Sequence, residues 1–230
     1  MPERDLGTVL ITGGSSGLGA AVVAAVADAG GRPVVLDRVL PARPVEYELV
    51  DLADGRAAEA AVRRLIDRCG PLDAVFTAAG TDACGRLEDV PPDDWERVVK
   101  VNLLGTVAVV RAALASLEAT GGTLVTVAST LGLRAFSDAT AYCASKFGVV
   151  GFTRALAAEL AGRVGVTLLV PGGMHTAFFD DRDERYKPPA DAKLNRPEDV
   201  AAAVLFALRQ PPGCEVRELV VTPSMESSWP

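Results

Sequence analysis

Uniformly apolar runs alternate with longer helix-like stretches along the whole chain. Apolar runs without a polar alternation are typical of strands that are covered on both faces of a sheet. The runs predict strands near residues 7–12, 32–37, 46–50, 72–77, 122–128, 164–170 and 216–221. The stretches between them predict helices near residues 17–30, 54–69, 93–118, 138–161 and 197–208. This alternation predicts an α/β fold, a doubly wound parallel seven-stranded sheet with helices on both faces.

One stretch, residues 174–195, does not fit the alternation. A chain of 230 residues is the right length for one α/β domain, so we expect residues 1–230 to form a single domain. Residues 174–195 are longer and more polar than a connection needs, with the charged run 180–185 and the prolines Pro188 and Pro189 inside. A plain surface loop would account for them. The functional interpretation, which we favour, is a lid over a substrate site.

Composition narrows the class of partner. Hydrophobic residues make up 49% of the chain, and 30 acidic against 23 basic residues give a net charge of −7. This balance argues against a nucleic-acid or anionic-membrane surface. Residues 1–5 lack the pattern of a signal peptide, and the apolar runs look shorter than the roughly 18 residues of a membrane span. We therefore expect a cytoplasmic protein.

The cysteines do not suggest a metal site. Cys69, Cys84, Cys143 and Cys214 are scattered without a metal-binding spacing, and the chain has a single histidine. Four reduced thiols are the expected state, and we predict no metal.

A glycine-rich turn follows the first predicted strand and opens the first helix. Residues 12–19 read Thr-Gly-Gly-Ser-Ser-Gly-Leu-Gly. Such a turn directs backbone N–H groups and a helix N-terminus at one point, which suits a pyrophosphate. Asp37 ends the second strand, where a carboxylate can accept hydrogen bonds from both ribose hydroxyls of NAD. Arg38 follows and could stack on adenine or accommodate a 2′-phosphate, so NAD is preferred and NADP remains possible.

A tyrosine and a lysine stand four residues apart on one predicted helix. Tyr142 and Lys146 therefore share a helix face, and an ammonium close to a phenol favours the phenolate and lowers the phenol's pKa. A phenol tuned in this way is a usable proton donor or acceptor. Ser129, at the end of the fifth apolar run, places a hydroxyl at a strand end, where it can point into a cleft.

With further motifs in a fixed order, the chain resembles the short-chain dehydrogenase/reductase family over nearly its whole length. The matching segments are residues 12–19, Asp37, Asp51-Leu52, Ala78-Ala79-Gly80, Asn102, Ser129, Tyr142 with Lys146, and residues 171–176. The resemblance implies a Rossmann domain. The chain departs from the family at Ala78, where the family usually has an asparagine that makes hydrogen bonds across the sheet, so the rigidity of this segment is in question.

The resemblance also implies roles for individual residues. Tyr142 is expected to be the general acid in reduction and the base in oxidation, with Ser129 bound to the carbonyl or alkoxide oxygen. Lys146 would lower the pKa of Tyr142 and hold the nicotinamide ribose, and Asn102 would keep a kink and a water in its helix. The expected cofactor-binding residues are Gly13, Ser15, Ser16, Gly17, Leu18, Gly19, Asp37, Arg38, Asp51, Leu52, Ala79, Gly80, Val101, Tyr142, Lys146, Pro171, Gly172, Met174 and Thr176. As isolated residues, Asp51 and Leu52 would be interpreted as a helix N-cap and a core leucine.

Candidate substrate residues lie between Ser129 and Tyr142 and at the start of the 174–195 segment. They are Arg134, Phe136, His175, Phe178 and Phe179. Arg134 would pair with a substrate carboxylate or remain solvated. The two phenylalanines would line the pocket or anchor the loop.

The predicted function is that of an NAD(P)-dependent oxidoreductase that interconverts an alcohol and a ketone or aldehyde by hydride transfer. One alternative is a dehydratase or epimerase on the same scaffold, although such enzymes usually have longer chains. The other is a catalytically silent dinucleotide-sensing regulatory protein, although such proteins usually lose the tyrosine or the lysine.

We also expect a homodimer or homotetramer, because the helices near 93–118 and 138–161 carry apolar residues on more than one face. These residues include Val107, Val110, Val149, Val150 and Phe152.

Overall fold

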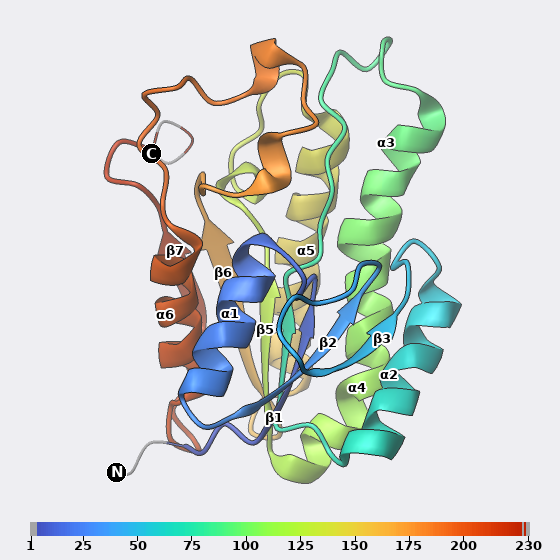
Figure 1. The fold of residues 1–230 in the computed structure, drawn as a ribbon, viewed down its shortest axis with the longest axis vertical. Coiled ribbons are helices and arrows are strands. Elements are labelled where there is room, and N and C mark those ends of the chain that lie inside the picture. Colours follow the sequence, from blue (N-terminus) through green and yellow to red (C-terminus); the bar gives the residue numbers. More distant parts are fainter. Residues whose placement is uncertain (1–3, 227, 229–230) are drawn as a thin grey trace.

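The computed structural model describes residues 4–226 and residue 228, and it contains one parallel sheet. The strand order is β3-β2-β1-β4-β5-β6-β7, and every neighbouring pair is parallel (Figure 1). The strands are β1 Thr8–Thr12, β2 Arg32–Asp37, β3 Glu46–Leu49, β4 Ala74–Thr77, β5 Thr123–Val127, β6 Gly165–Pro171 and β7 Glu218–Val221. The predicted doubly wound sheet is confirmed, with element ends shifted by one or two residues.

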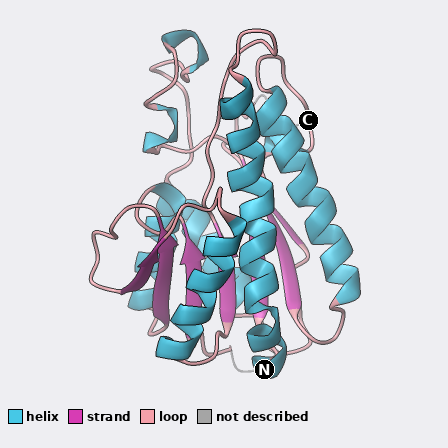
Figure 2. Ribbon diagram, turned by 90° about the vertical axis from the view of Figure 1, so that its right-hand side faces the viewer, coloured by secondary structure: helices cyan, strands magenta, loops and turns pink. Residues whose placement is uncertain are grey.

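Helices cover both faces of the sheet (Figures 1 and 2). They are α1 Gly17–Asp28, α2 Gly55–Cys69, α3 Pro92–Val99, α4 Thr106–Thr120, α5 Thr140–Glu159 and α6 Pro197–Leu208. Helices α1 and α6 pack on one face over a core that includes Ile11, Val26 and Val204. Helices α2, α4 and α5 cover the other face over Leu10, Leu65 and the neighbouring aliphatic residues. Burial of the central strands on both faces explains why their sequences are uniformly apolar.

The predicted helix 93–118 is a continuous helical run with a change of winding in the middle. Between α3 and α4, residues Lys100–Gly105 form a π-helix, and Asn102 lies inside it. A π-turn locally widens a helix and often marks a functional site, so the expected irregularity at Asn102 is confirmed.

By length and composition alone, this run, Pro92–Thr120, is long and apolar enough to cross a membrane. The mean hydropathy of its most apolar window is 1.7. The sequence-based expectation that no run is long enough was therefore wrong. Half of the most apolar window is buried inside the protein, as in the core helices of globular domains.

Three of the valines on which the expected oligomer rested are used inside the chain. Val110, Val149 and Val150 are almost completely buried, because α4 packs against the sheet and α2, while α5 packs against the sheet and α3. The helix faces that carry these three valines are therefore covered by other parts of the same chain. The large apolar side chains that these helices do expose are Leu104 and Phe147.

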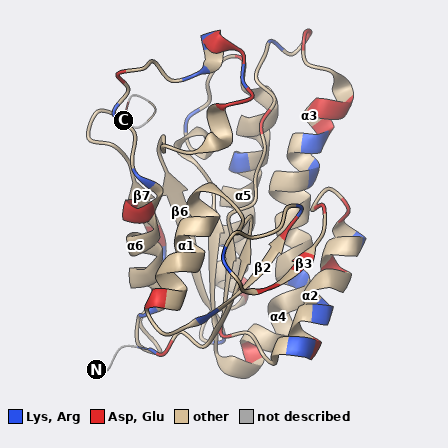
Figure 3. Cartoon of the chain, viewed as in Figure 1, with Lys and Arg blue, Asp and Glu red and all other residues tan. Residues whose placement is uncertain are grey.

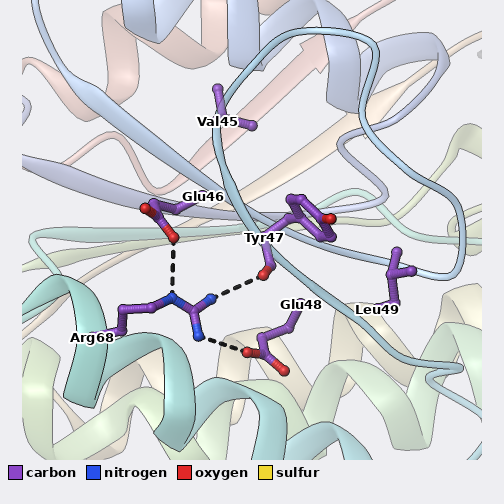
Figure 4. A pocket seen from close by; sticks show the side chains of 6 residues that line it. All are labelled: Val45, Glu46, Tyr47, Glu48, Leu49 and Arg68. Carbon is purple, nitrogen blue, oxygen red and sulfur yellow. Dashed lines mark hydrogen bonds and ion pairs between the residues drawn. The ribbon is translucent and has the colours of Figure 1, made fainter.

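Charged residues lie on the helices, the loops and strands β2, β3 and β7, whereas β1, β4, β5 and β6 carry none (Figure 3). At the edge strand β3, Arg68 of α2 donates to Glu46, Glu48 and the carbonyl oxygen of Tyr47 (Figure 4). A hollow of about 630 Å³ lies here, and no candidate site residue lines it. The arginine covers part of an otherwise open strand edge, a common protection against edge-to-edge pairing.

Candidate active site

The candidate residues converge at the carboxyl ends of the strands, where ligands bind in open α/β sheets. Strands β1 and β4 lie side by side in the middle of the sheet, and the chain crosses over in opposite directions from them. The glycine turn follows β1, the 78–80 segment follows β4, Ser129 follows β5, and Gly172 follows β6. The segment 174–195, orange in Figure 1, lies above these strand ends.

The glycine turn has no room for side chains at two positions. Gly13 has a φ of 68°, and a Cβ there would lie 2.8 Å from the backbone nitrogen of Ala79. A Cβ at Gly19 would collide with the carbonyl oxygen of Gly13. Ser16 precedes α1 without making a side-chain capping bond, so the first N–H groups of the helix are not capped by it. A bare backbone cradle at a helix N-terminus fits a pyrophosphate.

Asp37 lies beside this turn. Its Oδ2 accepts a hydrogen bond of 2.9 Å from the backbone N–H of Ser15, and its Oδ1 accepts one of 3.1 Å from Val39. These bonds fix the carboxylate at the end of β2, next to the glycine turn. Its position and chemistry fit an acceptor for a ribose diol. Arg38 is exposed on the following residue.

Asp51 and Leu52, both expected to bind the cofactor, lie in different surroundings. The Asp51 carboxylate accepts from the N–H of Ala53 and forms an ion pair of 2.8 Å with Arg97. Burial works to raise the pKa of Asp51, but these hydrogen bonds outweigh it, and the pKa lies below its usual range. Leu52 is buried against Gly105. The Asp51 side chain is therefore occupied within the protein, which leaves the backbone of this segment for a ligand.

The segment after β4 is held without the asparagine that Ala78 replaces. The hydroxyl of Thr12 accepts from the N–H of Ala79 at 3.1 Å. Asn102, which is buried, accepts from the N–H of Thr81 at 2.8 Å and donates to its carbonyl oxygen at 2.9 Å. These bonds tie the segment to β1 and to the π-helix.

The serine, tyrosine and lysine meet at one point. Lys146 lies with its Nζ 5.6 Å from the ring centre of Tyr142, and this Nζ donates to the carbonyl oxygen of Val127 at 2.9 Å. A hydrogen bond also links Tyr142 with the side chain of Ser129. Asn102 approaches the same helix, because its Nδ2 donates to the hydroxyl of Ser145 at 3.0 Å. The four predicted catalytic residues are therefore brought together by β5, α5 and the π-helix.

The expectation that Lys146 lowers the pKa of Tyr142 is wrong for this structure. Burial raises the pKa of Tyr142, and the nearby charge of Asp82 raises it further, while the hydrogen bond with Ser129 acts in the opposite direction. Burial also lowers the pKa of Lys146 to about 8, so its ammonium group loses a proton more easily than that of a solvated lysine. The lysine is directed to the Val127 carbonyl rather than to the phenol, and desolvation dominates both groups.

The segment after β6 approaches the glycine turn and the tyrosine. A Cβ on Gly17 would lie 3.3 Å from the methyl group of Thr176. The ring of Phe178 lies 5.8 Å from that of Tyr142, and Phe179 meets Phe178 edge-on at 5.7 Å. Phe178 therefore lies against the candidate catalytic tyrosine, with Phe179 beside it.

The other substrate candidates lie further out. Arg134 and Phe136 are exposed and stack on each other, with the guanidinium 5.5 Å from the ring centre. His175 is exposed, and its backbone N–H donates to the carbonyl oxygen of Asn195. It lines a hollow of about 540 Å³ formed within the 174–195 segment, which Thr176 and Phe179 also line and Tyr142 does not. Among the residues that the structure describes, no cluster of His, Cys, Asp or Glu could hold a metal ion.

The arrangement can hold a dinucleotide and exchange a proton beside it, and comparisons with known proteins decide its family. The family model described as short chain dehydrogenase matches residues 7–187. The chain belongs to the short-chain dehydrogenase/reductase family.

Relatives match most of the chain. A protein named as an uncharacterised oxidoreductase of Staphylococcus aureus is 31% identical over 226 residues, which span 93% of this chain and 96% of that protein. Glycine betaine reductase of Emericella nidulans is 30% identical over 236 residues, spanning 94% of this chain but only 19% of that protein. The chain thus corresponds to about a fifth of the second relative.

Solved structures agree with this assignment. The alcohol dehydrogenase of the archaeon Thermococcus sibiricus, solved with 5-hydroxy-NADP, has a TM-score of 0.84 at 25% identity and covers 93% of this chain and 95% of its own. Aldohexose dehydrogenase of Thermoplasma acidophilum has a TM-score of 0.85 at 21% identity, covers 95% of this chain and 93% of its own, and shows the shared fold alone.

Four residues that sequence reasoning missed contact the site. Asp82 and Arg182 form an ion pair of 2.6 Å, and Arg182 lies over the ring of Phe178, which packs on Tyr142. Glu226 accepts from the N–H of Gly173 at 2.9 Å, and Ser228 joins Glu226 to the hydroxyl of Thr130, next to Ser129. No local pattern marks these residues, because each meets its partner across at least 50 positions of the chain.

Glu226 should stabilise the protein in a pH-dependent way. Burial works to raise its pKa, but hydrogen bonds from Ser228 and Gly173 outweigh it, and the pKa lies below its usual range. A carboxylate of this kind stabilises the fold above its unfolded pKa, and the effect is lost as the pH falls through its folded pKa. Glu226→Gln should therefore lower the thermal unfolding midpoint at neutral pH, and its difference from the parent should shrink below about pH 4.

The matched control is Glu88→Gln, because Glu88 is exposed and its ion pair with Arg86 is equally exposed. Thermal unfolding of the three proteins at neutral and acid pH checks the expectation. An offset for Glu226→Gln that does not change with pH would contradict it.

Proposed function

We propose that the chain is an NAD(P)-dependent oxidoreductase that interconverts an alcohol and a ketone or aldehyde by hydride transfer. The observation that carries the proposal is the meeting of Ser129, Tyr142 and Lys146 at the carboxyl end of the sheet, beside the glycine turn. A hydroxyl, a phenol and an ammonium in one place offer both oxygen binding and proton exchange. The family membership supports it.

The residues present fit a dinucleotide. The backbone of residues 13–19 would hold the pyrophosphate, and Asp37 would accept from the adenosine ribose. Lys146 would hold the second ribose, and the backbone of residues 171–174 with Thr176 would receive the carboxamide. The nicotinamide ring, when bound, supplies or accepts the hydride.

The chain's own residues would handle the oxygen and the proton. Ser129 would donate a hydrogen bond to the substrate oxygen and hold it beside the Tyr142 hydroxyl. Tyr142 would give its proton to that oxygen in reduction and take it back in oxidation. Asn102 would support this path by holding Thr81 and Ser145 in place.

The cofactor preference that we propose is NAD, on the carboxylate of Asp37. Its hydrogen bonds with Ser15 and Val39 support a fixed acceptor at the ribose position. The T. sibiricus relative was solved with an NADP analogue, so both cofactors belong in the test.

The substrate that we propose is a medium-sized secondary alcohol or ketone with an apolar part, because Phe178 and Phe179 stand against Tyr142. A panel of such alcohols and ketones, offered with NAD, NADP, NADH and NADPH, tests the function through the absorbance of the reduced cofactor. Turnover of one member with either cofactor is expected. Tight cofactor binding without turnover across the panel would favour a dinucleotide-sensing protein instead.

We also propose a homodimer or homotetramer. The exposed side chains of Leu104 and Phe147, from neighbouring helical segments, support it. Burial of an apolar face against a second copy removes it from water. Light scattering at micromolar concentration should give a mass above the 23.9 kDa of one chain. Replacing Leu104 and Phe147 together by serine should shift the mass toward that of the monomer, and a monomeric parent would refute the proposal.

A further inference from the structure

A buried acidic residue lies beside the candidate active site and belongs to none of the motifs. Asp82, on the segment after β4, has a side chain that is only 7% exposed. Its Oδ1 accepts from the N–H of Ala83 at 2.7 Å, and its Oδ2 accepts from the thiol of Cys84 at 3.2 Å. Neither neighbour carries a positive charge. The charge of Asp82 is compensated by Arg182, whose Nη2 donates to Oδ2 at 2.6 Å.

Arg182 comes from the opposite side of the site. It belongs to the 174–195 segment, and its guanidinium lies 5.1 Å from the ring centre of Phe178 and 4.6 Å from that of Phe179. Its Nε is buried and has no hydrogen-bond partner among the described residues. Phe178 in turn packs on Tyr142. The ion pair therefore joins the 174–195 segment to the segment after β4, and Phe178 lies between Arg182 and the ring of Tyr142.

The two partners of the ion pair lie on different segments. The segment around Asp82 is tied to β1 and to the π-helix, because the backbone N–H groups of Ala79 and Thr81 donate to the side chains of Thr12 and Asn102. The 174–195 segment carries Arg182 and places Phe178 against the ring of Tyr142.

We infer that Asp82 and Arg182 are positioning residues that couple closure of the 174–195 segment to proton transfer at Tyr142. Closure brings a guanidinium onto the carboxylate beside the phenol, and opening leaves that carboxylate uncompensated. The inference rests on the proposed function, because it assigns the phenol a proton to exchange.

Asp82 and Arg182 carry opposite charges and therefore act on the pKa of Tyr142 in opposite directions. The negative charge of Asp82 works to raise the pKa of Tyr142, and the positive charge of Arg182 works to lower it. Asp82 also works to raise the pKa of Lys146, and burial together with Asp82 raises that of the Cys84 thiol to about 12. The polar and titratable groups around the phenol are Asp82 after β4, Ser129 after β5, Cys143 and Lys146 on α5, and Arg182 on the segment.

The test compares the pH dependence of alcohol oxidation in Asp82→Asn and Arg182→Gln. Oxidation needs the phenolate, so kcat/KM rises with pH through the pKa of Tyr142. Asp82→Asn should move this rise to lower pH and Arg182→Gln should move it to higher pH, each by about one unit, which is typical of removing one nearby charge. If the ion pair only held the segment closed, either substitution would break it, and the pH profiles of both variants would change in the same direction.

Further variants separate charge from folding. Arg182→Lys keeps the charge and should keep the parental pH profile even if KM rises. The matched controls are Arg185→Gln and Asp181→Asn, which remove exposed charges of the same segment and should leave the profile unchanged. Shifts of the two main variants in the same direction, or no shift in either, would overturn the inference.

A second readout does not need turnover. The chain has three tyrosines, so NMR of protein labelled at the hydroxyl-bearing ring carbon can follow Tyr142 in the presence of NAD, with Tyr142→Phe as the assignment control. Tyr142 should deprotonate at lower pH in Asp82→Asn than in Arg182→Gln. A parent without turnover refutes the proposed function alone, whereas the reverse order of deprotonation refutes the coupling.

Discussion

Replacing Tyr142 by phenylalanine should lower turnover about 10²–10⁴-fold, the usual contribution of a general acid or base. The phenol is partly buried beside Ser129 and Lys146, and its ring packs on Phe178. Phenylalanine keeps the ring and removes only the hydroxyl, so the pocket keeps its shape and loses its proton donor. Cofactor affinity should be nearly unchanged.

Steady-state kinetics and a cofactor titration on the same preparations check this expectation. Tyr47→Phe is the matched control, because Tyr47 is exposed on the edge strand β3 (Figure 4), and β2, β1 and β4 separate this strand from β5, which Ser129 follows. It should behave like the parent. Turnover of Tyr142→Phe within about threefold of the parent, well inside the expected range, would remove Tyr142 from the mechanism.

Replacing Asp37 by serine should weaken NAD binding and shift the cofactor preference toward NADP. A carboxylate that accepts two hydrogen bonds from a ribose diol contributes roughly 1.5–3 kcal/mol for each bond. The same carboxylate repels a 2′-phosphate. Serine removes both effects, and the exposed guanidinium of Arg38 on the next residue can then bind the phosphate.

The preference ratio is the quantity to measure, because Asp37 also accepts from Ser15 and Val39 and its loss will loosen the turn for both cofactors. Titration of NAD and NADP into the parent, Asp37→Ser and Asp37→Asn gives this ratio. Asparagine keeps an acceptor oxygen without the charge and should fall between the other two. A parent that prefers NADP, or a ratio that stays constant across the series, would exclude Asp37 as the ribose ligand.

The local pattern of the sequence was enough for the sheet and for the residues of the family motifs. Uniform apolar runs predicted the strands, because a strand buried on both faces has no polar side. The four-residue spacing of Tyr142 and Lys146 put them on one face of a helix, and the glycine-rich residues 12–19 between a predicted strand and a predicted helix indicated a phosphate-binding turn. Such features depend on neighbours in sequence, so they can be read without the fold.

Contacts between distant segments were decided only by the tertiary structure. The pairing of Asp82 with Arg182 spans 100 positions, and neither residue differs locally from a solvated surface charge. Burial also reversed one expectation, because desolvation raises the pKa of Tyr142 although Lys146 is close. The sequence by itself determined the fold and the candidate catalytic residues, whereas the balance of charges around the phenol depends on burial and on long-range packing.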